Sequence, residues 1–512
     1  VDADKLFSNL QDLKNLMDDY EFLDEEQEEA IRQFFQNFSI ERRTELKEKF
    51  ISLWDKLGII YHRYRENLAE LGIAYEGMLY RNVIEQLDTD RLKYDKYVFV
   101  GFNVLNKVEK EFFQKLQRAG KAMFYWDYDL FYTQRISKHE AGEFIKRNLI
   151  DFPNELPESY FDIFRKPKKI RYISASTENA QARFLFSQTA QMGSEKENAI
   201  VLCNEALLLP VLHSIPQDVQ NVNITMGFPL AQTPVYSFIN AAMELQTNGY
   251  RPDTGRFTYE AVSKILKHPY TRQLSDHATR LERELTKTNR FYPLPSELKK
   301  DDFLTILFTP QSNIRELCDY LLRLIKSISI LYRKEGEYDD IFNQLYRESI
   351  FQSHLKINRL YSLIESGELS VRTDTLKRLI TKVLTASNIP FHGEPAIGLQ
   401  IMGVLETRNL DFRNLIMLSL NEGQLPKAGG ESSFIPYNLR KAFGMTTIEH
   451  KNAVYAYYFY RLIQRAENIT LLYNTSSDGL NRGEESRFML QLLVEGPHEI
   501  TREYLEAGQS PQ

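Results

Sequence analysis

Apolar residues recur at helical spacing in the N-terminal part of the chain. Within IERRTELKEKFISLWDKLGIIYHRYRENLAELG, charged residues separate apolar positions that lie three or four residues apart: Leu46, Phe50, Leu53, Trp54, Leu57, Ile60 and Tyr61. This period is typical of an amphipathic helix that packs its apolar face into a core. We therefore expect residues 1–93 to form a packed helical subdomain.

The pattern changes to short apolar runs after residue 93. Residues 97–100 (YVFV) and 122–126 (AMFYW) are such runs, and a helical pattern over residues 108–119 separates them. Strand, helix and strand at this spacing predict a parallel α/β unit, which we assign to residues 94–166. The basic stretch FRKPKKIRY, residues 164–172, contains a proline and predicts a linker. It is either a solvated connector or a hinge that contacts phosphate.

A second α/β unit follows and is interrupted. Residues 167–233 contain the strand patterns IRYISAS, NAIVLCN and NVNITMG. Residues 234–395 return to helical periodicity, as in IRELCDYLLRLIKSI. Strand patterns resume in residues 396–512 with GLQIMGVLE, NLIMLSL and NITLLYN. The chain is therefore predicted to be an α/β protein with a helical insertion in its second parallel-sheet domain.

Composition restricts the class of protein. A chain of 512 residues predicts about three domains. The net charge of −6 gives no overall attraction to nucleic acid, so any such contact must come from local patches. Two cysteines exclude a disulfide framework or a cysteine-based zinc site, and they suit the cytoplasm. No run approaches the roughly 18 apolar residues of a membrane span. The first residue, Val1, and the final EAGQSPQ suggest a piece of a longer protein.

Common catalytic motifs are missing from the sequence. GxxxxGK[ST], GxGxxG, HExxH and GxSxG are all absent, and the nine histidines are scattered, so we expect no bound metal. Pro252-Asp253 and Glu297-Leu298-Lys299 formally match the PD…ExK nuclease pattern. That chemistry requires carboxylates on adjacent strands around Mg²⁺. We predict a turn at Asp253 and a polar loop at Glu297, and therefore no nuclease site.

Two C-terminal segments resemble motifs of superfamily 1 (UvrD-like) helicases. GLQIMGVLETRNLDFRNLIMLSLNEGQLP resembles the fifth motif at Leu410, Asp411, Phe412, Glu422, Gly423 and Pro426. FYRLIQRAENITLLYN resembles the sixth motif at Tyr460, Arg465 and Ala466. SSFIPYNLRKAFGM and SRFMLQLL look more like the AddB/RecC-type subunits of recombination helicase–nucleases. The resemblance implies two RecA-like (P-loop NTPase-like) parallel-sheet domains with large helical subdomains.

The departures from the helicase pattern imply a motor that does not hydrolyse ATP. KYVFVGFNVLNKVEKEF aligns with the second motif, but Gly101 and Phe102 replace the Asp-Glu pair that organises Mg²⁺ and water. Asp127, Asp411 and Arg465 stand at positions that belong to the nucleotide site in active motors. We therefore expect remnants of that site and no catalytic residue. The alternative is an ATPase completed by a P-loop upstream of the chain.

The resemblance also implies partners. The chain would be the central fragment of an AddB-like subunit in recombinational DNA repair, and it would bind single-stranded DNA through phosphate charge and base stacking. Candidate contacts are Trp126, Tyr128, Arg408 and Arg440, although Trp126 also fits core packing and Arg440 a surface charge. An AddA-like helicase subunit and an Mg²⁺-dependent PD-(D/E)xK nuclease domain outside these residues are further expectations. The rival hypothesis is an interaction scaffold that docks the helicase.

Overall fold

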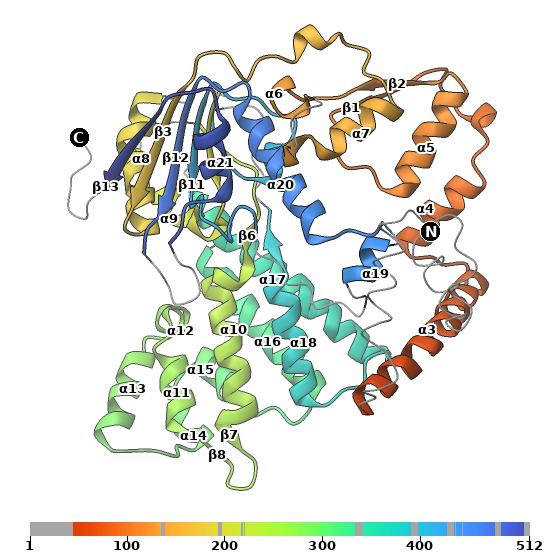
Figure 1. Ribbon diagram of the computed structural model, residues 1–512. Coiled ribbons are helices and arrows are strands. Elements are labelled where there is room, and N and C mark those ends of the chain that lie inside the picture. Colours follow the sequence, from red (N-terminus) through yellow and green to blue (C-terminus); the bar gives the residue numbers. More distant parts are fainter. Residues whose placement is uncertain are drawn as a thin grey trace. The chain divides into compact units, whose positions relative to one another are not determined.

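The computed structural model describes residues 45–134, 139–192, 197–216, 219, 221–332, 341–390, 398–427, 435, 437–442, 444–476 and 483–505, with the side chains of 45–55, 190–192, 341, 438, 439 and 442 left out (Figure 1). Two compact units can be distinguished. Unit 1 consists of Val1–Asn204, His213–Asn221 and Met402–Gln512, and unit 2 consists of Glu205–Leu212 and Val222–Ile401.

A seven-stranded parallel sheet confirms the predicted α/β class. Its strand order is β13-β3-β12-β11-β4-β10-β5. The predicted apolar runs form six of these strands: β3 (Lys169–Ala175), β4 (Asn198–Leu202), β5 (Val222–Ile224), β10 (Leu399–Gly403), β11 (Asn414–Leu418) and β12 (Asn468–Asn474). The pattern did not predict β13 (Ile500–Leu505), which pairs with β3 at the sheet edge.

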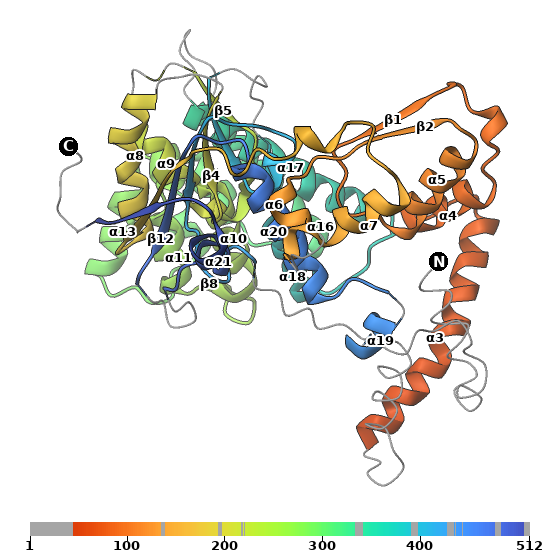
Figure 2. The ribbon, with the colours of Figure 1, turned by 45° about the horizontal axis from the view of Figure 1, so that its top comes forward.

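Helices cover both faces of the sheet in unit 1. Val201, Met417 and Leu471 point into a core shared with α20 (Ile448–Ile463) and α21 (Arg487–Glu495). Helix α8 (Glu178–Met192) packs against β3, β11 and β12, on the other side of the sheet in Figure 2. Because both faces are buried, these strands are almost continuously apolar.

A separate two-stranded parallel ribbon precedes this sheet in the chain. It pairs β1 (Tyr97–Val100) with β2 (Ala122–Tyr125), and α5 (Lys107–Arg118) connects the two strands, as predicted. The aromatic rings of Phe113 on α5 and Phe99 on β1 pack 4.1 Å apart between centroids. The short helices α6 (Leu130–Thr133) and α7 (Glu143–Asp151) follow. A first RecA-like domain over residues 94–166 stays a prediction.

The predicted N-terminal helices are present where the structure describes them, but their packing differs from the expectation. Helices α3 (Glu45–Glu70) and α4 (Glu76–Glu85) form, and residues 1–44 lie outside the described residues. Ile60, expected on the packed face, is 55% exposed. The spacing therefore predicted the helix correctly, whereas the predicted burial of Ile60 is wrong.

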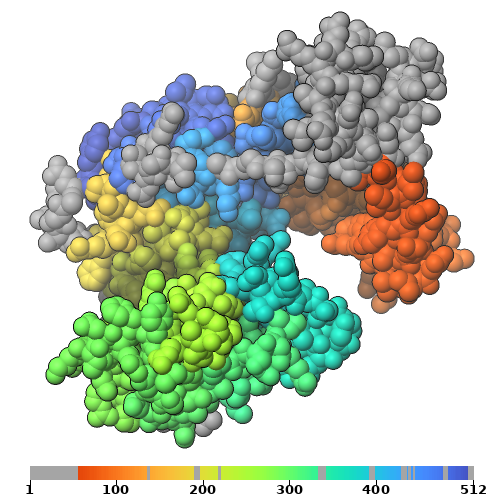
Figure 3. Space-filling model, turned by 90° about the horizontal axis from the view of Figure 1, so that it is seen from below, coloured from red at the N-terminus to blue at the C-terminus, as the bar shows by residue number. Residues whose placement is uncertain are grey.

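Unit 2 carries the predicted helical insertion, whose surface is green to cyan in Figure 3. It begins where predicted, because Thr233 caps α10 (Pro234–Glu244) and a proline occupies the first turn. The other helices are α11 (Tyr259–Leu266), α12 (Pro269–Leu274), α13 (Ala278–Lys287), α14 (Pro295–Leu298), α15 (Asp302–Leu307), α16 (Ile314–Ser329), α17 (Ile341–Glu365) and α18 (Thr373–Thr385). The ends of the insertion meet where β6 (Phe228–Pro229) pairs with β9 (Asn388–Ile389). Residue 395, the predicted end, lies outside the described residues.

Candidate nucleic-acid interface

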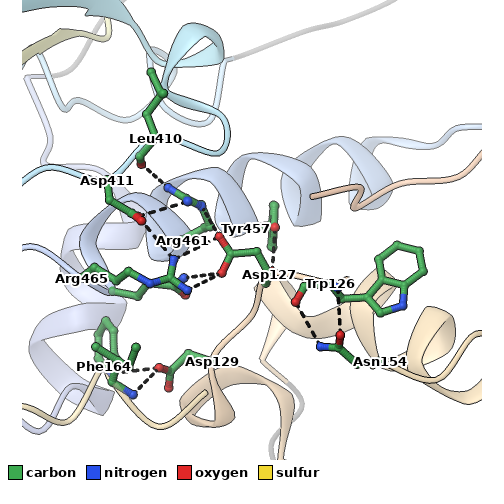
Figure 4. Close-up of polar contacts among 12 residues, drawn as sticks. Trp126, Asp127, Asp129, Asn154, Phe164, Leu410, Asp411, Tyr457, Arg461 and Arg465 are labelled. Atoms are coloured by element: carbon green, nitrogen blue, oxygen red, sulfur yellow. Dashed lines mark hydrogen bonds and ion pairs between the residues drawn. The ribbon is translucent and has the colours of Figure 1, made fainter. Parts of the chain in front are cut away.

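Two arginines and two aspartates form a partly buried ionic cluster in unit 1 (Figure 4). Asp127 Oδ2 lies 2.7 Å from Arg461 Nε, and Asp127 Oδ1 lies 2.7 Å from Arg465 Nη2. Gln464 Nε2 donates to Asp127 Oδ1 at 2.9 Å. Asp411 Oδ1 is 3.1 Å from Arg461 Nη2 and 3.3 Å from Arg465 Nη1. The cluster is formally neutral and connects three segments of the chain.

Local structure explains why these side chains meet. Asp127 follows β2, Arg461 lies in the last turn of α20, and Arg465 lies two residues beyond the end of this helix, so both guanidiniums stand near its C-terminal end. Arg461 is 4% exposed, and it also donates to the backbone carbonyl of Leu410, in the turn that precedes β11. The Tyr457 hydroxyl donates to the Asp127 carbonyl at 2.8 Å. The cluster therefore holds this turn and the post-β2 segment against α20.

The charges in the cluster stabilise one another. Burial alone raises the pKa of the Asp127 carboxyl, but the hydrogen bonds from Arg465 and the positive charges of Arg461 and Arg465 outweigh it, so the pKa is lowered. Burial lowers the pKa of the Arg465 guanidinium, but its hydrogen bonds and charge interactions with Asp127 and Asp411 raise it overall. Asp127 and Arg465 are consequently charged at neutral pH.

The structure brings the three predicted nucleotide-site residues together and adds a fourth that the sequence analysis missed. Asp127, Asp411 and Arg465 are direct neighbours, although their sequence numbers span more than 300 positions. Arg461 was not predicted, yet it is the most deeply buried member. In the sequence, its spacing of four residues before Arg465 was the feature that could have indicated its role.

The basic linker contributes a further contact to the end of α20. Lys168 Nζ donates to the backbone carbonyls of Gln464 and Ala466 at 2.8 and 2.9 Å, where a cation complements the helix dipole. Burial is the main reason why the pKa of Lys168 falls to about 8. The interpretation of this stretch as a fully solvated connector is therefore wrong for Lys168.

The loop after β1 lies against the turn before β11. Gly101 has φ +72°, and a Cβ atom at this position would lie 2.4 Å from Asn409 Nδ2. Asn409 itself has φ +60°, a conformation that asparagine tolerates better than most residues. Phe102 is 37% exposed and packs edge-on against Phe113 at 5.5 Å. The motif resemblance would align Gly101 and Phe102 with the carboxylate pair of active motors.

Two cavities beside this loop together form what we call the α5–α20 groove. The first, of about 430 Å³, is lined by Val100, Gly101, Phe102, Asn103, Val104, Glu109, Thr407, Arg408, Asn409, Val454, Tyr457, Tyr458 and Arg461. The second, of about 680 Å³, is lined by Val104, Leu105, Asn106, Lys107, Lys110, Phe144, Arg147, Asn148, Leu405, Gly444, Met445, Thr446, His450, Lys451, Val454, Tyr455 and Tyr458. The cavities share the lining residues Val104, Val454 and Tyr458, so they lie next to each other on the α20 surface.

The second cavity is basic and aromatic. Lys107, Lys110, Arg147 and Lys451 line it together with three aromatic rings, and no acidic side chain is among the described residues of its lining. Lys110 pairs with Asp151 at 2.6 Å and Arg147 with Glu143 at 3.1 Å, both carboxylates outside the lining. Glu109, in the lining of the first cavity, is engaged in the N-terminal cap of α5. The groove therefore presents cations and rings to a ligand.

Two of the four predicted DNA contacts are buried in the core. Trp126 and Tyr128 are each 3% exposed. The indole Nε1 of Trp126 donates to the Phe152 carbonyl at 2.7 Å, and the ring of Tyr128 stacks on Phe161 at 4.1 Å. Neither ring has a free face for a base, so core packing is the correct interpretation of both residues.

Of the other two predicted contacts, Arg408 lines the groove and Arg440 contacts a residue of its lining. Arg408 lines the first cavity, and its guanidinium lies over the ring of Tyr458 at 6.0 Å. Arg440, on α19 (Tyr437–Ala442), donates to the carbonyl of Thr446, a lining residue of the second cavity, at 3.1 Å. Their DNA contact stays a prediction, but their positions suit it.

The formal nuclease motif does not form a metal site. Asp253 lies in the turn between β7 (Tyr250–Arg251) and β8 (Arg256–Phe257), as predicted. Glu297 lies in the short helix α14 rather than in a loop, and it pairs with Arg290. Among the described residues, no group of three or more histidine, cysteine, aspartate or glutamate side chains is placed to hold a metal ion.

Comparisons with known proteins do not assign the chain to a family. No protein-family model matches it, and no curated protein matches it. In the described part of the chain, no helix has both the length and the apolar character needed to cross a membrane. The function is therefore argued from the geometry of unit 1 and from the motif resemblance.

Proposed function

We propose that this chain holds single-stranded DNA in the α5–α20 groove, within a motor-like fold that does not turn over ATP. The observation that carries the proposal is the lining of the second cavity, which combines four cationic side chains with aromatic rings and lacks an acid among its described residues. Non-specific single-strand binders use this combination, because cations follow the phosphates while bases stack on rings.

The cation distribution explains how an acidic chain can bind DNA. The net charge of −6 repels a polyanion at long range, but the local cations act within a Debye length of roughly 8–10 Å. Lys107 and Lys110 enter from the first turn of α5, and Lys451 enters from α20. Binding in this groove therefore depends on local charge and weakens steeply as salt increases.

The motif resemblance supplies the biological context of the proposal. An AddB/RecC-like subunit with two RecA-like domains would hold DNA beside an active AddA-like helicase in the cytoplasm, and an Mg²⁺-dependent nuclease domain would lie outside these residues. Gly101 and Phe102 support the loss of ATP hydrolysis, since neither side chain binds Mg²⁺ or orients water. Arg465 supports it too, because two carboxylates occupy its guanidinium.

The test is a titration of fluorescent single strands at several salt concentrations. We expect measurable binding at low salt and a linear fall of log K with log salt. Lys107→Ala combined with Lys451→Ala removes two cations of the groove and lowers the affinity. If each lysine contacts one phosphate, the slope decreases in magnitude by about 1.4.

The matched control removes two exposed lysines from unit 2. Lys287 lies on α13 and Lys326 on α16, so Lys287→Ala combined with Lys326→Ala changes the net charge by the same amount. We expect the control to retain the wild-type affinity and slope. Equal losses in both double variants, or no binding by the wild type at low salt, would refute the groove.

A second candidate function, a docking scaffold for a helicase subunit, is favoured by the open edge of β1. Val98 and Val100 are 55% and 62% exposed, and in the part of the chain that the structure describes β1 pairs only with β2. An unpaired strand edge with apolar side chains is a common site of strand addition. Two results together would favour this alternative. Neither the wild type nor the Lys107→Ala, Lys451→Ala double variant would bind single-stranded DNA, and both proteins would bind a purified helicase subunit equally tightly.

A further inference from the structure

The first cavity of the groove differs chemically from the second, because it contains amides that lack partners. Asn409 is exposed and lines this cavity, and its side chain makes no hydrogen bond with the described residues. Asn103 lies in the same wall and is 8% exposed, and neither its amide nitrogen nor its amide oxygen has a hydrogen-bond partner there. A buried amide without partners is uncommon and costly, so Asn103 calls for an explanation, whereas the exposed amide of Asn409 is open to solvent.

The asparagines of the second cavity are already engaged. Asn106 caps α5 by accepting from the Glu109 backbone amide at 2.8 Å. Asn148 Nδ2 donates to the backbone carbonyl of Asn103 at 2.6 Å. Amides without partners therefore occur on the side of the groove that also carries Phe102, and this difference indicates that the two cavities bind different parts of a ligand.

We propose that the first cavity binds one nucleobase, with adenine preferred, and that Asn409 reads its edge. An asparagine amide offers a donor beside an acceptor, which matches the N6 and N7 atoms of adenine. The partly exposed ring of Phe102 and the half-buried ring of Tyr458 supply faces for stacking. Rotation of the Asn103 side chain would bring a second amide to the same base.

The dimensions and continuity of the groove suit this arrangement. About 430 Å³ lies within the usual range of small-ligand pockets, roughly 300–1,000 Å³, and accommodates a single base. Tyr458 lines both cavities, so a strand whose phosphates lie along the basic second cavity can turn one base into the first. This inference rests on the proposed single-strand binding, and it adds a base preference to it.

Gly101 has a defined role in the cavity. With no side chain, it leaves room for the Asn409 amide, which a Cβ atom would displace. The glycine that removes an acidic group from the loop is thus also the residue that allows the amide to occupy the wall. Arg408, the neighbour of Asn409, places a cation beside the same base.

The experiment measures the affinity for labelled oligonucleotides of equal length that carry adenine, thymine or an abasic site at one central position. We expect the adenine strand to bind at least about fivefold more tightly than the abasic strand. Asn409→Gly removes the amide and keeps the positive φ accessible, so it should abolish the preference. The salt dependence should stay unchanged, since the substitution removes no phosphate contact.

Asn289→Gly is the matched control, because Asn289 also has positive φ, +50°, and lies in unit 2. It should retain the base preference. Phe102→Leu keeps an apolar side chain but removes the ring, and it should weaken binding to every base-containing strand relative to the abasic strand.

Competition with adenosine monophosphate identifies the source of the base. In one outcome, adenosine monophosphate binds the wild type, the Asn409→Gly variant binds it more weakly, and no strand binds either protein. The base site would then stand with a free nucleotide as its ligand, and the groove proposal would fail. If strands bind with normal salt dependence but with equal affinity for all three central positions, the base site is refuted and the groove proposal stands.

Discussion

At the scale of single residues, the ionic cluster shows how little of a charged side chain's role can be deduced from its motif position. The motif resemblance would place Arg465 where active motors carry a phosphate-contacting arginine, yet its guanidinium is held by Asp127 and Asp411. Arg461, in the last turn of α20, adds a second guanidinium. Breaking a buried pair leaves an uncompensated charge, which costs more than the pair itself contributes.

Asp127→Asn should therefore destabilise unit 1 strongly. The change removes the negative charge between Arg461 and Arg465, and we expect a loss of about 3 kcal/mol in the free energy of unfolding, measured by urea denaturation. Glu467→Gln is the control, because Glu467 pairs with Arg413 at 2.8 Å while both side chains are more than half exposed. That loss should stay below about 1 kcal/mol. Similar losses in both variants would contradict a structural role for the cluster.

At the scale of secondary-structure elements, α5 links stability to the proposed binding. Its N-terminal cap is a capping box in which Asn106 and Glu109 exchange side-chain and backbone hydrogen bonds. Lys107 and Lys110 follow within the first turns, so the cap also fixes the start of the basic cavity. Helix α16 in unit 2 has a comparable cap, in which Asn313 accepts from the Glu316 amide at 2.9 Å.

Asn106→Ala and Asn313→Ala should separate these two effects. Each removes an N-cap acceptor, and each should lower the free energy of unfolding by about 1 kcal/mol, measured by denaturant titration. Only Asn106→Ala should weaken single-strand binding at low salt, because it loosens the turn that carries Lys107. Unchanged binding in Asn106→Ala, despite the expected loss of stability, would separate α5 from the groove.

Element prediction succeeded where the hydrophobic pattern was strong. The runs that form β4 and β11 are apolar because the sheet is covered on both faces. The helical period of apolar residues in α16 corresponds to one buried face of that helix. Strand β13 escaped prediction because ITREYL has apolar residues only at its ends and four exposed residues between them. Its pairing with β3, rather than its own pattern, makes it a strand.

At the scale of the whole molecule, the proposed loss of ATP hydrolysis distinguishes a scaffold from a motor. Hydrolysis needs Mg²⁺ ligands, an oriented water and a cradle for the phosphates. The sequence has no GxxxxGK[ST], and under the proposed resemblance Gly101 and Phe102 take the places of the acidic pair. A P-loop supplied upstream of this chain would restore the cradle but not these carboxylates.

We therefore expect no Mg²⁺-dependent phosphate release from ATP by the purified chain, with or without single-stranded DNA. The measurement is a phosphate-release assay on stringently purified protein, repeated with Arg465→Ala to identify a contaminating ATPase. Turnover that copurifies with the chain and is abolished by Arg465→Ala would show that the site is active. Turnover that survives Arg465→Ala would instead identify a contaminating ATPase.

The sequence by itself determined the α/β class, the strand–helix–strand unit around α5 and the start of the helical insertion at Pro234, because local periodicity and capping encode these features. The resemblance to helicase motifs singled out Asp127, Asp411 and Arg465, whose role as remnants of a nucleotide site stays a prediction. Only the tertiary structure decided that they form one neutral cluster with Arg461, that Trp126 and Tyr128 are core residues, and that Asn103 and Asn409 share a cavity. These facts depend on contacts between segments hundreds of residues apart, and no local pattern of side chains records them.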